Sequence, residues 1–301
     1  MRHPLRHGWH SVEPARQPVL FVNLRSGGGK AAGARLVERA RERGINAVVL
    51  RLHDDPAELA RRAVAGGADA LGVAGGDGSL AVVAAVALAH GLPFVCVPAG
   101  TRNHFALDLG VDRHDPVGSL DAFGDDAVER SIDVADVNGR VFLNNVSVGV
   151  YGEAVRQTAY RDAKLRTLLA TAAKVLGPSG PAPDLCVVDD LGGEHRGPAV
   201  LLVSNNPYAV DRPVAQGTRP RLDSGELGIV ALGRLRSSAD PPGRAWSATR
   251  ITVRGSAPVH AGIDGEAVDL AAPLEFVIRP GALRVRISSR HPGVSPSGRL
   301  P

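Results

Sequence analysis

The first half of the chain alternates short apolar runs with longer segments of helical periodicity. The apolar runs are rich in β-branched residues and are bounded by Gly or polar residues, which is typical of buried strands. They cover Val19–Val22, Ala47–Leu50, Leu71–Ala74 and Phe94–Val97. The helical segments are Lys30–Arg43, Pro56–Ala65 and Ser79–His90. This β-α-β order predicts a parallel sheet with helices on both faces, which binds ligands at the carboxyl ends of its strands.

After about residue 128 the pattern changes to short β-rich runs bounded by Gly, Pro and Asn, which predicts a mostly antiparallel β-sandwich. The runs are Ser131–Val137, Val141–Val148, Leu185–Val188, Ala199–Val203, Gly228–Leu232, Arg250–Val253, Leu274–Ile278 and Leu283–Ile287. A helical segment, roughly Glu153–Leu176, interrupts them. We therefore expect an α/β domain over residues 18–128, rejoined near 282–288, and a sandwich domain over 129–287. The ends, 1–17 and 288–301, are expected to be disordered tails.

A glycine-rich loop follows the third predicted strand and precedes a helix. It reads Gly75-Gly76-Asp77-Gly78-Ser79. Consecutive glycines let the backbone approach a ligand and turn its N–H groups toward it, and the helix points its positive end at the same place. This arrangement favours phosphate binding over a plain turn with a solvated acid. Because an acid is poorly suited to meet phosphate directly, Asp77 is predicted to hold Mg²⁺ or a hydroxyl group.

Two more loops follow strands of the same predicted sheet. Asn23 to Lys30 (Asn-Leu-Arg-Ser-Gly-Gly-Gly-Lys) lacks the spacing of a Walker loop, and alone it fits a flexible turn equally well. Pro98 to Asn103 (Pro-Ala-Gly-Thr-Arg-Asn) follows the fourth strand, and its hydroxyl and amide groups suit phosphate or ribose. Three loops of donors at one sheet edge predict a nucleotide-binding site in the α/β domain.

A pair of acids follows the run Val259–Ile263 in the second half, at Asp264-Gly265-Glu266. Paired carboxylates suit metal binding or deprotonation of an alcohol. From spacing alone, however, an ordinary hairpin turn is the simpler interpretation.

The net charge of +4 is concentrated at the chain ends. Residues 1–18 carry three arginines and one glutamate, and residues 288–301 carry two arginines and no acid, which gives +2 at each end. The segment between them is neutral and shows no basic stripe with interleaved aromatics, which argues against nucleic acid as a partner. The basic ends suit solvated tails or contact with an anionic membrane surface.

Cys96 and Cys186 lie far apart in apolar runs, as expected of core residues in a reducing compartment. The longest apolar run, Leu80–Ala89, is shorter than the ~20 residues that a membrane span needs. The N-terminus has no apolar stretch typical of a secretion signal. We expect a cytoplasmic protein that contacts the inner membrane surface peripherally.

At these motifs the sequence resembles the diacylglycerol kinase catalytic family, which includes bacterial lipid kinases and sphingosine kinases. The family pattern is Asn-Pro-x-Ser-Gly, Gly-Gly-Asp-Gly-Thr, Pro-x-Gly-Thr-x-Asn-Asp-Phe-Ala and a late Asp-Gly-Glu. The matching segments are Asn23 to Gly27, Gly75 to Ser79, Pro98 to Ala106 and Asp264 to Glu266, joined by Phe142–Gly149. The resemblance extends from about Val19 to Arg286. The Gly-Gly-Asp-Gly loop alone would not be specific, since NAD kinases and phosphofructokinases share it.

The resemblance implies an ATP- and Mg²⁺-dependent kinase that transfers the γ-phosphate to the hydroxyl of a lipid alcohol, diacylglycerol-like or sphingoid. Glu266, with Asp264 beside it, matches the family's acid at the acceptor hydroxyl, which reverses the hairpin-only interpretation. Asp77 is the rival for the role of base. The residues implied as ATP contacts are Asn23, Ser26, Gly27, Gly75, Gly76, Asp77, Gly78, Ser79, Gly100, Thr101 and Asn103. Catalysis would rest on positioning and on charge neutralisation by Mg²⁺ and backbone donors.

The chain departs from the family pattern at several positions. Leu24 replaces the Pro of the first motif, Val82 stands where many members carry Glu, and His104 replaces the Asp of the third motif. Family members often hold a structural Mg²⁺ at an Asp-Asp-Gly turn. Here Ser224 takes the place of the second acid, so Asp223 is the candidate ligand that remains.

Two alternatives stay open from the sequence. An NAD kinase-like enzyme would share the Gly-Gly-Asp-Gly loop, although that family's Asn-Glu dipeptide is not found after it. A non-catalytic nucleotide or lipid sensor would account for the departures at His104, Val82 and Ser224. The acceptor lipid is not fixed by the sequence, and neither is the oligomeric state, since an exposed edge strand would allow a homodimer.

Overall fold

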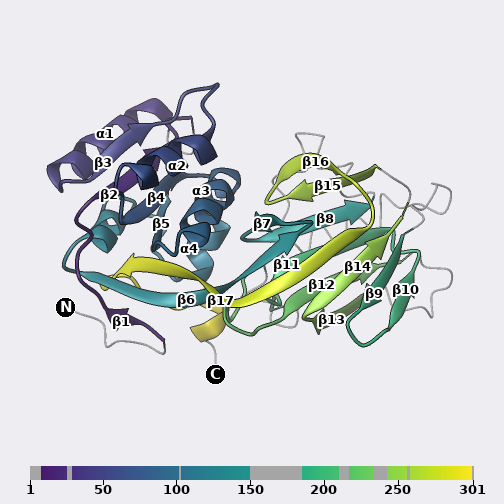
Figure 1. The fold of residues 1–301 in the computed structure, drawn as a ribbon. Helices are drawn as coiled ribbons and strands as arrows, with labels where there is room; N and C mark the ends of the chain where they lie inside the picture. Colours follow the sequence, from purple (N-terminus) through teal and green to yellow (C-terminus); the bar gives the residue numbers. More distant parts are fainter. Residues whose placement is uncertain are drawn as a thin grey trace. The chain divides into compact units, whose positions relative to one another are not determined.

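The computed structural model describes residues 8–25, 29–101, 103–149, 185–209, 217–233, 243–255 and 258–299. The chain divides into two compact units (Figure 1). Unit 1 runs to Ile132 and resumes at Gly281, and unit 2 comprises Asp133–Pro280. The helix predicted for Glu153–Leu176 lies outside the described residues. None of the helices within the described ranges combines the length and apolar character needed to span a bilayer.

Unit 1 is built on a parallel sheet, as the sequence pattern predicts. Its strand order is β17 (Leu274–Ser288), β5 (Phe94–Pro98), β4 (Ala70–Gly75), β2 (Pro18–Val22) and β3 (Asn46–Val49). All four pairings are parallel. The helical elements of this unit are α1 (Gly29–Glu42), α2 (Pro56–Ala65), α3 (Asp77–Ala89), α4 (His104–Asp108) and the 3-10 helix η1 (Gly118–Phe123).

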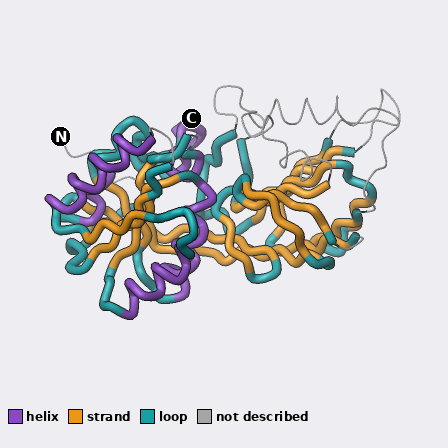
Figure 2. The backbone as a smooth tube through the Cα atoms, turned by 90° about the horizontal axis from the view of Figure 1, so that it is seen from above, coloured by secondary structure: helices purple, strands orange, loops and turns teal. Residues whose placement is uncertain are grey.

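Helices lie on both sides of the unit 1 sheet (Figure 2), and every residue of strands β2, β4 and β5 is buried. Leu20 of β2 and Leu36 of α1 share a core cluster with Phe123 of η1. Gly72 of β4 is required on this face, because an added Cβ would lie 2.6 Å from Cζ of Phe123. Helix α3 is buried and apolar on most sides, which suits its place between β4 and α2.

Unit 2 is an antiparallel β-sandwich, which confirms the prediction for the second half. One sheet has the order β13 (Arg244–Ala248), β12 (Leu227–Leu232), β11 (Val200–Asn205), β8 (Asn145–Gly149), β15 (Val259–Ile263) and β16 (Glu266–Leu270). The other has the order β10 (Glu194–Arg196), β9 (Cys186–Asp189), β14 (Arg250–Arg254), β17, β6 (Ala127–Val137) and β7 (Arg140–Phe142). Their inner faces share one apolar core, in which Phe142 and Phe276 meet edge to face at 6.3 Å.

Strand boundaries differ from prediction where long-range contacts decide them. The predicted strand Val141–Val148 is two strands, because the chain bends at Leu143 and Asn144 between β7 and β8. The two predicted strands at Leu274–Ile278 and Leu283–Ile287 are the single strand β17. Strands β6 and β17 carry the chain between the units, so the boundary falls inside β6 at residues 132 and 133 and not at residue 128.

The described parts of both chain ends are ordered, contrary to the prediction of disordered tails. Strand β1 (His10–Ser11) pairs with β6, and Trp9 is buried, with Nε1 donating to the carbonyl oxygen of Gly293 at 2.8 Å. Ser295 and Ser297 are buried near the other end. The partners of Trp9 and of β1 lie more than 100 residues away along the chain, so local composition does not reveal this packing.

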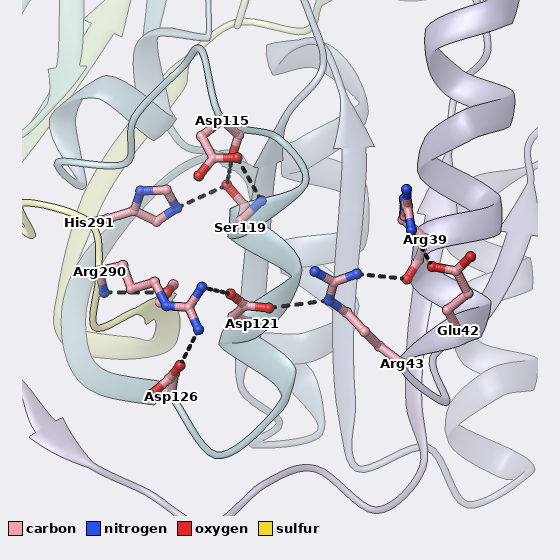
Figure 3. A network of polar contacts seen from close by, with 11 residues as sticks. Arg39, Glu42, Arg43, Asp115, Ser119, Asp121, Asp126, Arg290 and His291 are labelled. Atoms are coloured by element: carbon pink, nitrogen blue, oxygen red, sulfur yellow. Dashed lines mark hydrogen bonds and ion pairs between the residues drawn. The ribbon is translucent and has the colours of Figure 1, made fainter. Parts of the chain in front are cut away.

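His291 anchors the C-terminal segment to η1 through Ser119 (Figure 3) and to the loop before it through Asp112. Its Nδ1 accepts from the N–H of Asp112 at 3.3 Å. Its Nε2 lies 3.2 Å from the Ser119 hydroxyl, which itself donates to the carbonyl oxygen of Asp115. Nε2 must therefore carry the proton, so both contacts need the neutral imidazole. Burial lowers the pKa of His291, against the opposing effect of Asp115, Asp112 and Asp121.

We predict that the free energy of unfolding falls more steeply below about pH 6.5 in the wild type than in His291→Gln. The unfolded chain takes up a proton there that the folded chain resists, because the folded pKa of His291 is lowered. Gln can donate to Ser119 and accept from Asp112 without titrating. Urea unfolding at a series of pH values from 8 to 5.5 measures the difference, with exposed His90→Gln as the control. Equal pH slopes for wild type and His291→Gln would contradict it.

Candidate active site

The three predicted loops of unit 1 meet at the carboxyl edge of its sheet. An added Cβ on Gly100 would lie 2.6 Å from Cα of Gly76 and 3.1 Å from the carbonyl oxygen of Gly75. One on Gly75 would lie 3.4 Å from Cβ of Ser79 and 3.6 Å from Cβ of Asn23. The loops after β2, β4 and β5 are therefore in contact at their backbones. Glycine is required where two main chains approach this closely.

The first loop is stabilised by a local turn. The side-chain oxygen of Asn23 accepts from the N–H of Arg25 at 3.1 Å, which is the pattern of an Asx turn. Leu24 packs against α1, where an added Cβ on Gly33 would lie 2.5 Å from its Cδ2. These contacts hold the turn without the Pro of the family pattern. Ser26 and Gly27, predicted ATP contacts, lie outside the described residues.

Asn103 closes the third loop on itself. It adopts a left-handed backbone conformation with φ of 53°. Its Oδ1 accepts from the N–H of Gly100 and its Nδ2 donates to the carbonyl oxygen of Gly100, both at 2.8 Å. The buried amide is thus engaged within the loop, whereas Thr101 is exposed beside it. Asn103 shapes the loop, and Thr101 is the residue that presents a hydroxyl.

Asp77 links the N-termini of two helices. It is the first residue of α3, and its two carboxylate oxygens each lie 3.4 Å from a backbone N–H at the start of α4, those of His104 and Phe105. Hydrogen bonds of this length are weak, so the carboxylate keeps the capacity to bind a cation. Burial, and then the Asp77 charge, raise the pKa of Cys96 well above its usual range, which marks this cysteine as a core residue.

Asp264 in unit 2 belongs to a tight hairpin turn between β15 and β16. Asp264 and Gly265 have φ of 48° and 87°, and Ile263 pairs with Glu266 across the turn, as in a type I′ turn. The Asp264 carboxylate is buried and accepts three backbone N–H groups, from Leu143 at 2.8 Å, Asn144 at 2.8 Å and Asn145 at 3.1 Å. Its oxygens are therefore committed to holding the bend between β7 and β8.

Glu266 is the accessible acid of the pair. Its side chain is 58% exposed, and it forms a long ion pair with Arg140, whose Nη2 lies 3.8 Å from Oε2. Sequence reasoning did not single out Arg140, because a lone Arg at the start of a short strand has no motif around it. The two acids thus differ in environment, since buried backbone N–H groups occupy Asp264 whereas Glu266 is exposed at the surface.

The turn at Asp223 does not fit the structural Mg²⁺ site that the family resemblance implies. The Asp223 carboxylate is half exposed and accepts from Nε of Arg221 at 3.0 Å. Nearby, Nδ2 of Asn206 donates to Asp133 at 2.7 Å and to the Ser224 hydroxyl at 2.9 Å, so hydrogen bonds occupy this turn. Within the described ranges, no three His, Cys, Asp or Glu side chains gather closely enough to hold a metal ion.

The fold resembles that of solved structures. A crystal structure described as a diacylglycerol kinase from Bacillus anthracis str. Sterne superposes with a TM-score of 0.65 at 17% identity, covering 93% of this chain and 98% of that one. At this identity the comparison establishes the fold: an α/β unit joined to an antiparallel β-sandwich, as in diacylglycerol kinases.

Sequence comparison then shows which proteins the chain is similar to. Residues 17–137 match the model of the family described as diacylglycerol kinase catalytic domain. A Pseudomonas aeruginosa protein named "Probable lipid kinase YegS-like" is 28% identical over 264 residues, covering 79% of this chain and 83% of that protein. The diacylglycerol kinase of Bacillus subtilis is 33% identical over 124 residues, 40% of each chain. Residues 17–137 therefore resemble the diacylglycerol kinase catalytic domain, and the chain is of the class of phosphotransferases with an alcohol acceptor.

We predict that Gly100→Ala lowers the affinity for ATP·Mg²⁺ at least about tenfold, or ~1.4 kcal/mol. The new methyl group would overlap Cα of Gly76 and push the second and third loops apart. Isothermal titration calorimetry measures the affinity. Gly124→Ala is the matched control in unit 1, because its nearest contact would lie at 3.9 Å. An unchanged affinity in folded Gly100→Ala would show that loop contact is not needed for binding.

Proposed function

We propose that the protein is an ATP- and Mg²⁺-dependent lipid kinase that transfers the γ-phosphate to the hydroxyl of a diacylglycerol-like or sphingoid lipid. The observation that carries the proposal is the backbone contact between Gly76 and Gly100, which brings two glycine-rich loops and the start of α3 to one sheet edge. Backbone N–H groups at a helix N-terminus bind phosphate. The match to the diacylglycerol kinase catalytic domain supports the same chemistry.

The phosphates of ATP would lie against the loop Gly75–Ser79, with the hydroxyl groups of Ser79 and Thr101 as further donors. Asp77 would hold Mg²⁺, since its carboxylate has only long hydrogen bonds to the protein. The metal, when bound, neutralises charge on the phosphates. The loops supply a fixed set of donors, which do not have to reorganise when the nucleotide arrives.

At the acceptor, Glu266 would orient the lipid hydroxyl and take its proton. The contrast with Asp264 supports this assignment, because three backbone N–H groups occupy the Asp264 carboxylate whereas Glu266 is exposed. Asp77 stays the rival for the role of base. Its carboxylate would then accept the proton of the acceptor hydroxyl in place of holding Mg²⁺. An acceptor of this class resides in a bilayer, so the proposal includes peripheral contact with a membrane from the cytoplasm.

We expect a labelled phospholipid when the protein is incubated with γ-labelled ATP, Mg²⁺ and a total lipid extract, and no label when Mg²⁺ is replaced by EDTA. Thin-layer chromatography and mass spectrometry identify the product, and a parallel incubation contains NAD in place of lipid. Label in NAD alone would replace the proposal with an NAD kinase. ATP binding without any labelled product would indicate a nucleotide sensor.

We predict that Glu266→Gln lowers the turnover number at least about 100-fold, in line with the loss of a general base, and changes the free energy of unfolding by less than about 0.5 kcal/mol because the side chain is exposed. Asp264→Asn should instead destabilise the protein by about 1–3 kcal/mol, because an amide cannot accept all three buried N–H groups. Urea unfolding and initial rates measure both. A Glu266→Gln variant with wild-type turnover would exclude this base.

A further inference from the structure

Arg219 is the largest side chain in unit 2 that is fully shielded from solvent, among the described residues. Its exposed fraction is 0%, and its Nη1 donates to the carbonyl oxygens of Leu143 and Asn205, both at 2.6 Å. Its Nη2 donates to Oδ1 of Asn144 at 3.1 Å. A buried guanidinium is costly unless its donors are satisfied. Hydrogen bonds to three different residues, two of them short, show that its position is tightly specified.

Two of the three residues that accept from Arg219, Leu143 and Asn144, belong to the same bend that Asp264 holds. The Leu143 carbonyl accepts from Arg219, while the Leu143 N–H donates to Asp264. The Asn144 side chain accepts from Arg219, while the Asn144 N–H donates to Asp264. The acceptor groups of Leu143 and Asn144 therefore bind the Arg219 cation, while their backbone N–H groups bind the Asp264 anion. The bend between β7 and β8 is fixed by both charges together.

Tyr208 extends this arrangement to the third residue of the bend. The guanidinium carbon of Arg219 lies 5.9 Å from the Tyr208 ring centroid, within the range of a cation–π contact. The Tyr208 hydroxyl accepts from Nδ2 of Asn145 at 2.9 Å. The Asn145 N–H is the third donor to Asp264. Each residue of the bend Leu143–Asn145 is thus hydrogen-bonded either to Arg219 itself or to Tyr208, which Arg219 contacts.

The bend in turn sets the hairpin that carries Glu266. Asp264 is tied to it by three accepted hydrogen bonds and by its own N–H, which donates to the carbonyl oxygen of Asn145 at 2.9 Å. Only Gly265 separates this anchored residue from Glu266, the first residue of edge strand β16. A displacement of the bend would move the turn, and the Glu266 carboxylate with it.

We infer that Arg219 is a positioning residue for Glu266, acting through the bend Leu143–Asn145 and Asp264. The inference rests on the proposed function of Glu266 as the acid at the acceptor hydroxyl. Lys cannot replace Arg here, because one ammonium nitrogen cannot match two terminal nitrogens that reach acceptors on three residues. Because Arg219 would act on the group that meets the lipid hydroxyl, its substitution should not change the affinity for nucleotide.

The first test does not need activity. Amide hydrogen exchange of residues 143–145 is compared in wild type, Arg219→Lys and Arg221→Lys. Arg221 is the matched control, because it lies two residues away, its side chain is 69% exposed and it pairs with Asp223 at the surface. We expect exchange at least about tenfold faster at this bend in Arg219→Lys and no change in Arg221→Lys. Equal protection in all three proteins would overturn the inference, whether or not any lipid is phosphorylated.

The second test is a double-mutant cycle on turnover, at a temperature where urea unfolding shows every variant to be folded. Arg219→Lys should lower the turnover number about tenfold with the KM for ATP unchanged. In a Glu266→Gln background the same change should have little further effect, because both substitutions remove one function. An equal fold-loss in both backgrounds, or a loss that appears as a raised KM for ATP, would overturn the inference. Failure of wild type to phosphorylate any lipid would instead contradict the proposed function and leave the exchange test standing.

Discussion

Contact between two main chains is the constraint on which the proposed nucleotide site of unit 1 depends. Gly76 and Gly100 approach so closely that no side chain fits between them, and this fixes the loops after β4 and β5 as one surface. Asp77 then connects the first turn of α3 to the first turn of α4. The donors are therefore arranged by steric contact within the protein, and a ligand does not have to assemble them. Such preorganisation reduces the entropy that binding must overcome.

In unit 2 a backbone bend is fixed by buried charged side chains, whereas in unit 1 the loops are fixed by glycine contacts. Asp264 and Arg219 are both shielded from solvent, and each directs its polar atoms at the bend between β7 and β8. Buried ions add little net stability, but they define one geometry because any other arrangement leaves a charge unsatisfied. This explains how two acids only two residues apart differ in role. Burial commits Asp264 to structure, and exposure leaves Glu266 available for chemistry.

The sequence was informative where structure is determined locally. The strands and helices of unit 1 follow from apolar runs, since both sheet faces are buried, and the glycine loops follow from their position between strand and helix. The bend at Leu143 could not be predicted, because the carboxylate that causes it is about 120 residues away. Trp9 and His291 likewise sit in polar, basic segments that composition assigns to disorder, and distant partners order them. Arg219 carries no local signal, because only the folded sandwich removes it from water.

The return of the chain to unit 1 has a consequence for biosynthesis. The second half of β17 pairs with β5, and the residues that bear it follow the whole of unit 2. While the ribosome is still translating the sandwich, β5 has an open edge of N–H and C=O groups, which is a template for incorrect pairing. The α/β unit therefore closes last although its first residues emerge first. Residues from Gly281 onward thus complete a unit whose other residues precede the sandwich.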